Sequence, residues 1–472
     1  MVLATVIDGI ARNAERMADS VSESLFEPVI RLGVTGLSRS GKTVFITSLV
    51  ANLLDRGRMV QFSATADGRI ASVFLQPQPD DTVPRFDYET HLQAMTGPKP
   101  HWPQSTRAIS QLRLSFRVQP KGILGGLRGP RTVHLDIVDY PGEWLLDLPL
   151  MDLSFAQWST QALALAKGRE VQAKGFLKLL AGVDATQKLD ESLAQKLAQS
   201  FTGYLSDSRE AGYSACAPGR FLMPGDLAGS PALTFCPLPE GASPRGSLTR
   251  EFSRRYAAYK SKVIKPFFRD HFARIDRQIV LIDALGAVHH GPQAVADLKL
   301  AMVDVLKAFR PGRRSWLWSL LGQRRVEKIL FAATKADHLH HEQHANLEAL
   351  MQALVRDAKD RAEFSGAQTG SIALASLRTT VEETHDHDGQ SLNCVRGTLL
   401  DTGKEAAMYA GELPDDPALI VNAAAGGARE WLDADYAVMN FAPAKIALKQ
   451  GMGPPHIRLD KAAEFLIGDK VS

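Results

Sequence analysis

The chain of 472 residues is longer than one ordinary domain, so two or three packed units are expected. A hydrophobic content of 45% indicates a globular protein with a large core, and a net charge of only +3 gives no bulk electrostatic footprint for nucleic acid. Cys216, Cys236 and Cys394 are too few and too scattered for a disulfide framework or a zinc site, which favours a reducing compartment.

Residues 1–28 are expected to form an amphipathic helix that packs on the rest of the protein, because apolar residues recur there at helical spacing. The segment lacks the basic start and the continuous apolar core of a secretory signal. The sequence contains no run of about 18 apolar residues, so no membrane span is predicted. The polar face of the helix mixes acidic and basic side chains, which argues against a basic lipid-binding face.

Residues 29–57 predict a strand, a phosphate-binding loop and a helix. VIRLGVT (29–35) is typical of a buried parallel strand, and it leads into GLSRSGKT, the Gly-x-x-x-x-Gly-Lys-Thr pattern whose backbone N–H groups wrap phosphates. The helix expected next places the loop at a helix N-terminus, which favours binding of an anion. This context argues against the alternative of a glycine-rich turn that binds nothing. We predict that the nucleotide contacts Gly36, Ser38, Arg39, Ser40, Gly41, Lys42, Thr43 and Val44, with Lys42 also catalytic and Thr43 bound to Mg²⁺.

A second direct Mg²⁺ ligand is expected just before the alternating strand QLRLSFRV (111–118). Thr106 is the candidate for this switch I position, where it would also serve catalysis, and Ser105 is the alternative. Arg107 could neutralise charge on a transferring phosphoryl group, although an exposed surface arginine is the simpler explanation.

The stretch TVHLDIVDYPGEW (132–144) predicts a buried strand that ends in an Asp-x-x-Gly motif. In switch GTPases this aspartate binds Mg²⁺ through water and the glycine N–H meets the γ-phosphate, which assigns these roles to Asp139 and Gly142. A plain strand followed by a Pro-Gly turn would explain the same residues. Glu143 follows as a catalytic candidate that could orient or deprotonate water.

More than a hundred residues separate Gly142 from the next candidate parallel strand, RQIVLIDAL (277–285), and they favour helices. Apolar residues recur every fourth position between 189 and 205, and a further helix over 250–272 is expected to kink or break at Pro266. The basic residues of that helix could meet an acidic partner or lipid headgroups, but a solvated helix face explains them too.

The base of the nucleotide is expected to be recognised after the strand KILFAATKADHL (328–339). Thr334, Lys335 and Asp337 form a Thr variant of the Asn-Lys-x-Asp motif, in which the aspartate accepts hydrogen bonds from guanine that adenine cannot donate. A third strand within GSIALASLRTT (370–380) brings further candidate contacts, since its last residues could offer backbone N–H groups to the guanine oxygen. These residues are Ala375, Ser376 and Leu377.

Two other segments are compatible with binding. ADHLHHEQH (336–344) gathers four histidines, but no acidic or cysteine third ligand stands at metal-site spacing, so no zinc site is expected. RRSWLWSLLGQRR (313–325) could touch an anionic membrane surface or serve as a packed connector.

Several strings together carry a family resemblance. They are GLSRSGKTVFITSL, DYPGEWLLDLPL, PGRFLMPGDLAGSPALTF, FAATKADHLHH and PHIRLDKAAEFL. The chain resembles the YcjX-like P-loop proteins of bacteria over nearly its whole length. The resemblance implies a Ras-like nucleotide-binding core, GTP and GDP as ligands, a cytoplasmic role in stress responses and a membrane-protein partner. Thr334 departs from the general GTPase pattern at the usual Asn, and Glu143 at the water-orienting Gln of Ras-type proteins.

These observations predict an α/β fold: a Ras-like P-loop NTPase core with a mixed, mostly parallel sheet and an inserted, mainly helical domain. The expected order is an N-terminal helix (1–28), the first half of the core (29–143), the insertion (144–275) and the second half with C-terminal elements (276–472). The function expected is a Mg²⁺-dependent switch that binds GTP and GDP and hydrolyses GTP slowly. It would be cytoplasmic or peripheral at the inner membrane, without a nucleic-acid partner. An ATPase and a nucleotide-dependent scaffold with negligible turnover are the alternatives.

Overall fold

The computed structural model describes residues 27–37, 39–104, 108–119, 130–307, 326–364, 366–426 and 438–471. Ser38, Thr106 with its neighbours Ser105 and Arg107, most of the N-terminal segment and the basic-aromatic segment 313–325 lie outside these ranges. The predictions made for them therefore remain predictions.

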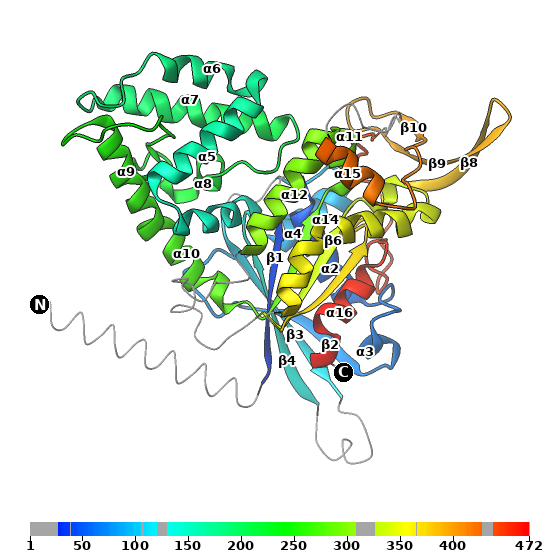
Figure 1. Ribbon diagram of the computed structural model, residues 1–472. Helices are drawn as coiled ribbons and strands as arrows, with labels where there is room; N and C mark the ends of the chain where they lie inside the picture. Colours follow the sequence, from blue (N-terminus) through cyan, green and yellow to red (C-terminus); the bar gives the residue numbers. More distant parts are fainter. Residues whose placement is uncertain are drawn as a thin grey trace, which may run out of the picture.

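A seven-stranded sheet forms the centre of the molecule (Figure 1), in the order β2-β3-β4-β1-β5-β6-β7. β3 is antiparallel to both of its neighbours, whereas β4, β1, β5, β6 and β7 run parallel. The mixed, mostly parallel sheet expected from the sequence is thus confirmed. The strands are β1 (Val29–Gly36), β2 (Ile70–Gln76), β3 (Ser110–Val118), β4 (Arg131–Asp139), β5 (Arg277–Ile282), β6 (Lys328–Ala333) and β7 (Gln368–Ala373).

Helices cover both faces of this sheet, as the burial of β5 shows. Its residues Ile279 and Leu281 join one hydrophobic core, and Val280 and Ile282 join the other, because successive side chains of a strand point to opposite faces. Residues 279–282, which follow Arg277 and Gln278 in this strand, are therefore all apolar. The first core lies under α2 (Lys42–Asp55), α3 (Ser63–Ala66), α4 (Tyr88–Thr96) and α16 (Leu459–Val471), and the second under α11 (Ala284–His289), α12 (Pro292–Lys307), α14 (His344–Phe364) and α15 (Ala418–Gly426).

Between β4 and β5 the chain is helical and forms the lobe at the upper left of Figure 1. Trp158, Phe201, Phe235 and Tyr256 pack against one another in its interior. They belong to the same hydrophobic core as α12 and α14, so the insertion is fused to the sheet domain. Its elements are η2 (Gly142–Asp152), α5 (Phe155–Gly168), α6 (Glu170–Ala181), α7 (Glu191–Glu210), α8 (Gly219–Leu222), η3 (Gly225–Leu227), η4 (Pro231–Leu233), α9 (Leu248–Tyr259), η5 (Lys260–Ile264), α10 (Lys265–Asp270) and η6 (Phe272–Arg274).

The irregularity expected at Pro266 lies one turn earlier. The η5 segment is a π turn that joins α9 to α10, with the N–H of Lys265 donating to the carbonyl of Lys260. Pro266 occupies the first turn of α10, where its missing N–H is tolerated, so the helix path widens before the proline and continues through it.

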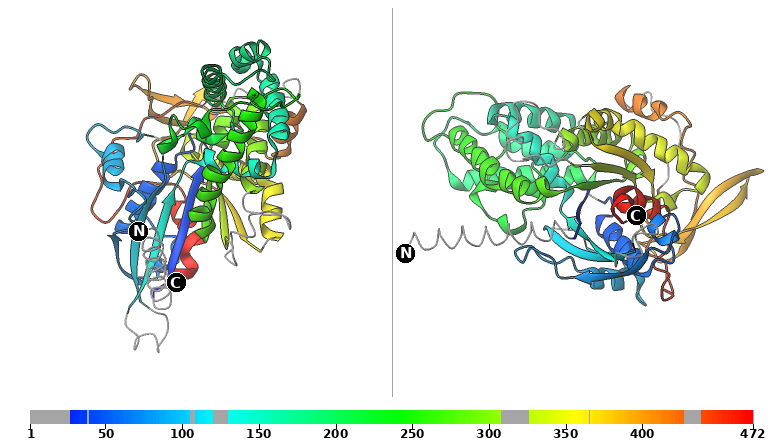
Figure 2. Two further views of the ribbon diagram at one scale, coloured as in Figure 1. Left: turned by 90° about the vertical axis from the view of Figure 1, so that its left-hand side faces the viewer. Right: turned by 90° about the horizontal axis from the view of Figure 1, so that it is seen from below.

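A second, three-stranded antiparallel sheet follows β7 and was not anticipated from the sequence. It contains β8 (Val381–His387), β9 (Gln390–Thr398) and β10 (Glu405–Met408). The β8–β9 hairpin and the helical insertion project from opposite sides of the core (Figures 1 and 2). Among the helices formed by the described residues, none is both long and apolar enough to cross a bilayer.

Candidate nucleotide-binding site

The glycine-rich loop connects the end of β1 to the start of α2, at the carboxyl edge of the sheet. Arg39 and Gly41 both adopt left-handed backbone conformations, with φ of 64° and 78°. Such turns aim successive N–H groups into one concavity that suits an anion. The Lys42 Nζ donates to the carbonyl oxygen of Gly36 at 3.0 Å, which holds the ammonium across the loop.

Two glycines make the loop possible for steric reasons. A Cβ at Gly36 would lie 2.1 Å from the Ser40 hydroxyl, and a Cβ at Gly142 would lie 2.2 Å from the Gly36 carbonyl oxygen. The Cβ at Gly36 would also lie 2.8 Å from the Leu281 carbonyl oxygen, so at both positions a backbone oxygen stands too close for any residue but glycine unless the backbone shifts. This close approach brings the Asp-x-x-Gly turn directly onto the phosphate loop.

The two described candidates for Mg²⁺ ligands stand on neighbouring elements. Asp139 ends β4, pairs with Val34 of β1 and is 2% exposed, and Thr43 is a buried residue of the first turn of α2. Carboxylate and hydroxyl oxygens are the ligands that Mg²⁺ prefers, so the residues present fit this ion.

The predicted base-reading motif lies where β6 ends. The Thr334 hydroxyl donates to the Ile282 carbonyl at 3.3 Å, and the Lys335 ammonium lies 2.5 Å from the Asp283 carboxylate. Burial opposes ionisation of Asp283, but the charge and hydrogen bond of Lys335 outweigh it, so the pKa of Asp283 is lowered. These contacts fix the ends of β5 and β6 beside each other.

Asp337 itself is only 4% exposed. Its Oδ2 accepts hydrogen bonds from the backbone N–H of Thr379 at 2.9 Å and from the Thr379 hydroxyl at 2.7 Å. The carboxylate is thus oriented by the loop that follows β7, and this pairing leaves its other oxygen, Oδ1, as the acceptor for a base.

The last predicted contacts, Ala375, Ser376 and Leu377, are all buried. The Ala375 N–H donates to the Ile457 carbonyl at 3.1 Å and is therefore engaged within the protein. The prediction of a donor to the guanine oxygen is accordingly left with Ser376 and Leu377.

Ile457 belongs to a C-terminal strap, residues 453–458, whose role the sequence did not reveal. The Pro454 carbonyl accepts from the Asn52 side chain in α2, and the Pro455 carbonyl accepts from the N–H of Arg378. The strap thus ties the base-reading loop to the helix of the phosphate loop. In the sequence this segment overlaps the string PHIRLDKAAEFL, which supported the family resemblance but indicated no binding or catalytic residue.

The histidine-rich segment differs in part from the expectation. His344 bonds to the carbonyl oxygen of Ala336, but His340 and His341 lie with Glu342 so that their possible ligand atoms are within 4.8 Å of one another. An acidic third ligand is thus present after all, because a 3-10 turn brings adjacent residues together. Two of the three residues are exposed, as is common without a metal.

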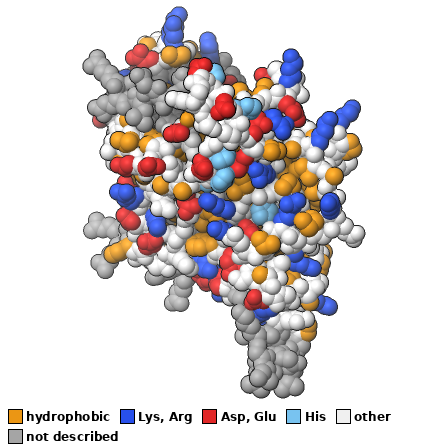
Figure 3. Space-filling model, turned by 90° about the vertical axis from the view of Figure 1, so that its right-hand side faces the viewer, with side chains coloured by type: hydrophobic (Ala, Val, Ile, Leu, Met, Phe, Trp, Pro, Cys, Tyr) orange, Lys and Arg blue, Asp and Glu red, His pale blue; other side chains and the backbone are white. Residues whose placement is uncertain are grey.

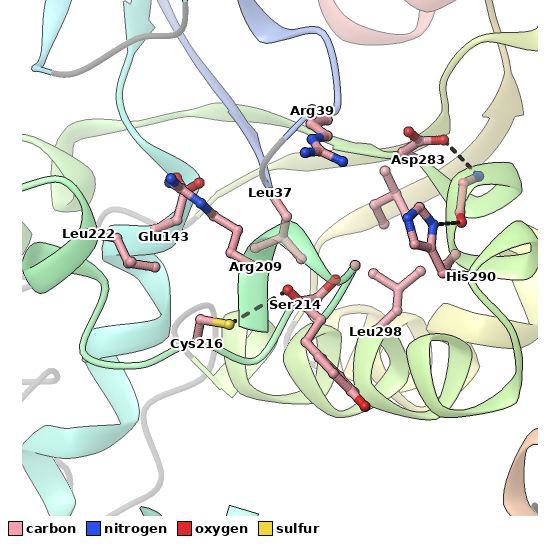
Figure 4. A pocket seen from close by; sticks show the side chains of 15 residues that line it. Leu37, Arg39, Glu143, Arg209, Ser214, Cys216, Leu222, Asp283, His290 and Leu298 are labelled. Atoms are coloured by element: carbon pink, nitrogen blue, oxygen red, sulfur yellow. Dashed lines mark hydrogen bonds between the residues drawn. The ribbon is translucent and has the colours of Figure 1, made fainter. Parts of the chain in front are cut away.

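A pocket opens between the phosphate loop and the helical insertion (Figure 4). Leu37 and Arg39 of the loop, Glu143 and Asp283 line it from the core, and residues at the end of α7 line it from the insertion. Glu143 is 4% exposed, and a Cβ at Gly219 would lie 1.9 Å from its carbonyl oxygen. The insertion therefore packs directly on the residue that follows the Asp-x-x-Gly motif.

Residues 30–471 match the sequence model of a family described as "YcjX-like family, DUF463". The chain belongs to the YcjX-like family. A protein of Escherichia coli (strain K12) named "Ras-like GTPase YcjX" is 38% identical over 456 residues, covering 94% of this chain and 96% of the relative. A protein of the same name from Shewanella oneidensis is 33% identical over 475 residues, with 94% of each chain covered. The resemblance stated from the sequence and the Ras-like fold class are confirmed.

Proposed function

We propose that this member of the YcjX-like family binds GTP and GDP with Mg²⁺ and hydrolyses GTP slowly as a molecular switch. One observation carries the proposal: the phosphate loop, the Asp139-x-x-Gly142 turn and Asp337 meet at one edge of the sheet in the order that a nucleotide requires. Two relatives bear the name of a Ras-like GTPase, which supports it.

The phosphates would lie against the loop amides, with Lys42 on the outer phosphates. Thr43 and Asp139 would hold Mg²⁺, with Thr106 as a further ligand, and the ion would neutralise charge on the phosphates. Gly142 would present its N–H to the γ-phosphate. Glu143 stands where Ras-type proteins have a neutral Gln. Its carboxylate would bring negative charge toward the phosphates, so intrinsic turnover is expected to be slow.

Asp337 would recognise guanine. Thr379 occupies one carboxylate oxygen and leaves the other to accept from the ring N–H and the exocyclic amine. The role in stress responses, the cytoplasmic or inner-membrane location and a membrane-protein partner are proposed from the family resemblance alone.

The test is a calorimetric titration of GTP, GDP, ATP and ADP, with and without Mg²⁺. Two hydrogen bonds to a charged acceptor, at about 1.5–3 kcal/mol each, should make GTP bind at least roughly 100-fold tighter than ATP. Asp337→Asn should lose GTP affinity and gain affinity for xanthosine triphosphate, whose base carries a carbonyl in place of the amine. The nitrogen of the substituted amide can donate to that carbonyl, while its oxygen still accepts from the ring N–H.

Asp388→Asn is the matched control, because its side chain is 93% exposed at the tip of the β8–β9 hairpin. Equal affinity of the parent protein for ATP and GTP would replace the GTPase by the ATPase alternative. Tight GTP binding without measurable turnover would favour the nucleotide-dependent scaffold.

A further inference from the structure

Arg209 is a basic residue of the insertion that lines the pocket beside the phosphate loop. It stands in the last turn of α7, and its side chain extends toward Glu143, with Arg39 of the loop nearby (Figure 4). The sequence alone indicates no role for Arg209, since it lies 66 residues beyond Glu143 in a helix predicted only from its apolar spacing.

Among the described residues, Arg209 lacks the ion pairs that other arginines of the insertion have. Its Nη1 is buried without a hydrogen-bond partner, and no carboxylate of the described residues forms an ion pair with it. By contrast, Arg169 bonds to Asp297, and Arg255 lies 2.5 Å from Glu191. Leaving a buried guanidinium N–H unpaired is unfavourable, so such a group marks a place where a ligand can supply the acceptor.

The platform that carries Arg209 is fixed to the core. Asp297 of α12 accepts hydrogen bonds from the N–H groups of Ser214 at 2.5 Å and Ala215 at 2.8 Å, just beyond the end of α7. Tyr213 donates its N–H to the Ser208 carbonyl, which closes the helix end. The backbone at the end of α7, from which the Arg209 side chain extends, is therefore fixed by hydrogen bonds to the core.

We propose that Arg209 is a catalytic arginine that the insertion supplies to the GTPase site of the same chain. This inference rests on the proposed function. During hydrolysis the oxygen of a water molecule bonds to the γ-phosphorus, and the bond from that phosphorus to the β–γ bridging oxygen breaks. The bonding electron pair leaves with GDP, and the proton of the water ends on inorganic phosphate.

Arg209 would donate N–H groups to the phosphoryl oxygens on which negative charge grows in the transition state. Its positive charge would also offset the carboxylate of Glu143 in the same pocket. A positive charge in this pocket would let a carboxylate stand near the γ-phosphate.

The experiment compares the parent protein with Arg209→Ala, Arg209→Lys and the control Arg245→Ala, whose side chain is exposed on a loop of the insertion. Three quantities are measured: GDP affinity, the single-turnover rate of GTP hydrolysis, and the tightening of GDP binding by aluminium fluoride, which mimics the transferring phosphoryl group. We expect Arg209→Ala to lower the rate at least roughly 100-fold and to abolish the aluminium fluoride effect. GDP affinity should change less than about 3-fold, and Arg209→Lys should recover part of both losses.

A variant Arg209→Ala that hydrolyses GTP at the parent rate, or that still responds to aluminium fluoride, would overturn the inference. So would a parent protein that binds GDP but shows no aluminium fluoride effect. Absence of guanine-nucleotide binding by the parent would instead overturn the proposed function itself.

Discussion

At the scale of single residues, the phosphate loop is defined by contacts that tolerate no other side chain. The backbone of Gly142 lies against the Gly36 carbonyl, and the same carbonyl accepts the Lys42 ammonium at 3.0 Å. The Lys42 side chain and the turn at Gly142 thus contact the same peptide group. A charged side chain bonded to a backbone carbonyl can move to a phosphate without a change of fold, because phosphate oxygens are the stronger acceptors.

Lys42→Ala should therefore weaken GTP binding by roughly 100-fold or more, through the loss of charge-assisted hydrogen bonds of about 1.5–3 kcal/mol each. The unfolding midpoint should stay nearly unchanged, because Lys42 is only half-buried and its one hydrogen bond is worth about 1 kcal/mol. Titration calorimetry and thermal denaturation of the same samples measure both. Parent-like GTP affinity in a folded variant would remove the phosphate-loop assignment.

At the scale of elements, η2 couples the turn after Gly142 to the insertion through one buried carboxylate. Asp147 accepts from the N–H of Gly219 at 2.7 Å and from the Tyr259 hydroxyl at 2.5 Å. Burial raises the pKa of Asp147 to about 6, against the opposing effect of these hydrogen bonds. The connection between η2, α8 and α9 therefore responds to pH.

The direction of that response follows from the raised pKa. The fold favours the protonated form, so the stabilisation from Asp147 is complete below about pH 4 and is lost as the pH rises through about 6. Asp147→Asn removes this titration. Relative to the parent protein, its unfolding free energy should rise between pH 4 and pH 7.5 by up to about 3 kcal/mol, at about 1.4 kcal/mol per pKa unit.

Urea denaturation at a series of pH values measures this difference. Asp152→Asn serves as the control, because Asp152 is an exposed aspartate at the end of the same element. If the curves of parent and Asp147→Asn run parallel, the carboxylate of Asp147 is ionised at no cost and the coupling is independent of pH.

At the scale of the whole molecule, the C-terminal helix closes one face of the sheet. α16 packs against β1, β5 and β6, and the strap before it holds the base-reading loop. Residues more than 400 positions apart thus share one core, as with Leu49 and Leu466. On the face shown in Figure 3, acidic and basic side chains are interspersed, which agrees with the small net charge.

Leu466→Ala should lower the unfolding free energy by about 2–5 kcal/mol, because Leu466 is 1% exposed and its loss leaves a cavity between α16 and the sheet. Lys461→Ala on the exposed side of the same helix should change the unfolding free energy by less than about 0.5 kcal/mol. Urea denaturation followed by tryptophan fluorescence measures both. Similar small effects of the two substitutions would show that α16 adds little to the common core.

The sequence by itself determined six of the seven strands of the central sheet, the phosphate loop and the Asp139 turn, but not the edge strand β2. These features depend on local requirements: alternating or continuous apolar residues in strands, and glycine where the chain approaches itself at Gly36 and Gly142. Asp337 was found for the same reason, since a motif of four adjacent residues follows a buried strand.

Only the tertiary structure decided the rest. Arg209 lines the pocket beside the phosphate loop. Thr379 orients Asp337 by hydrogen bonds, and the Ile457 carbonyl accepts the N–H of Ala375. Each of these contacts joins residues between 42 and about 170 positions apart, and none imposes a periodicity or a fixed spacing on the sequence. Such pairs are set by how the insertion and the C-terminal strap pack on the sheet, and that packing depends on the whole core at once.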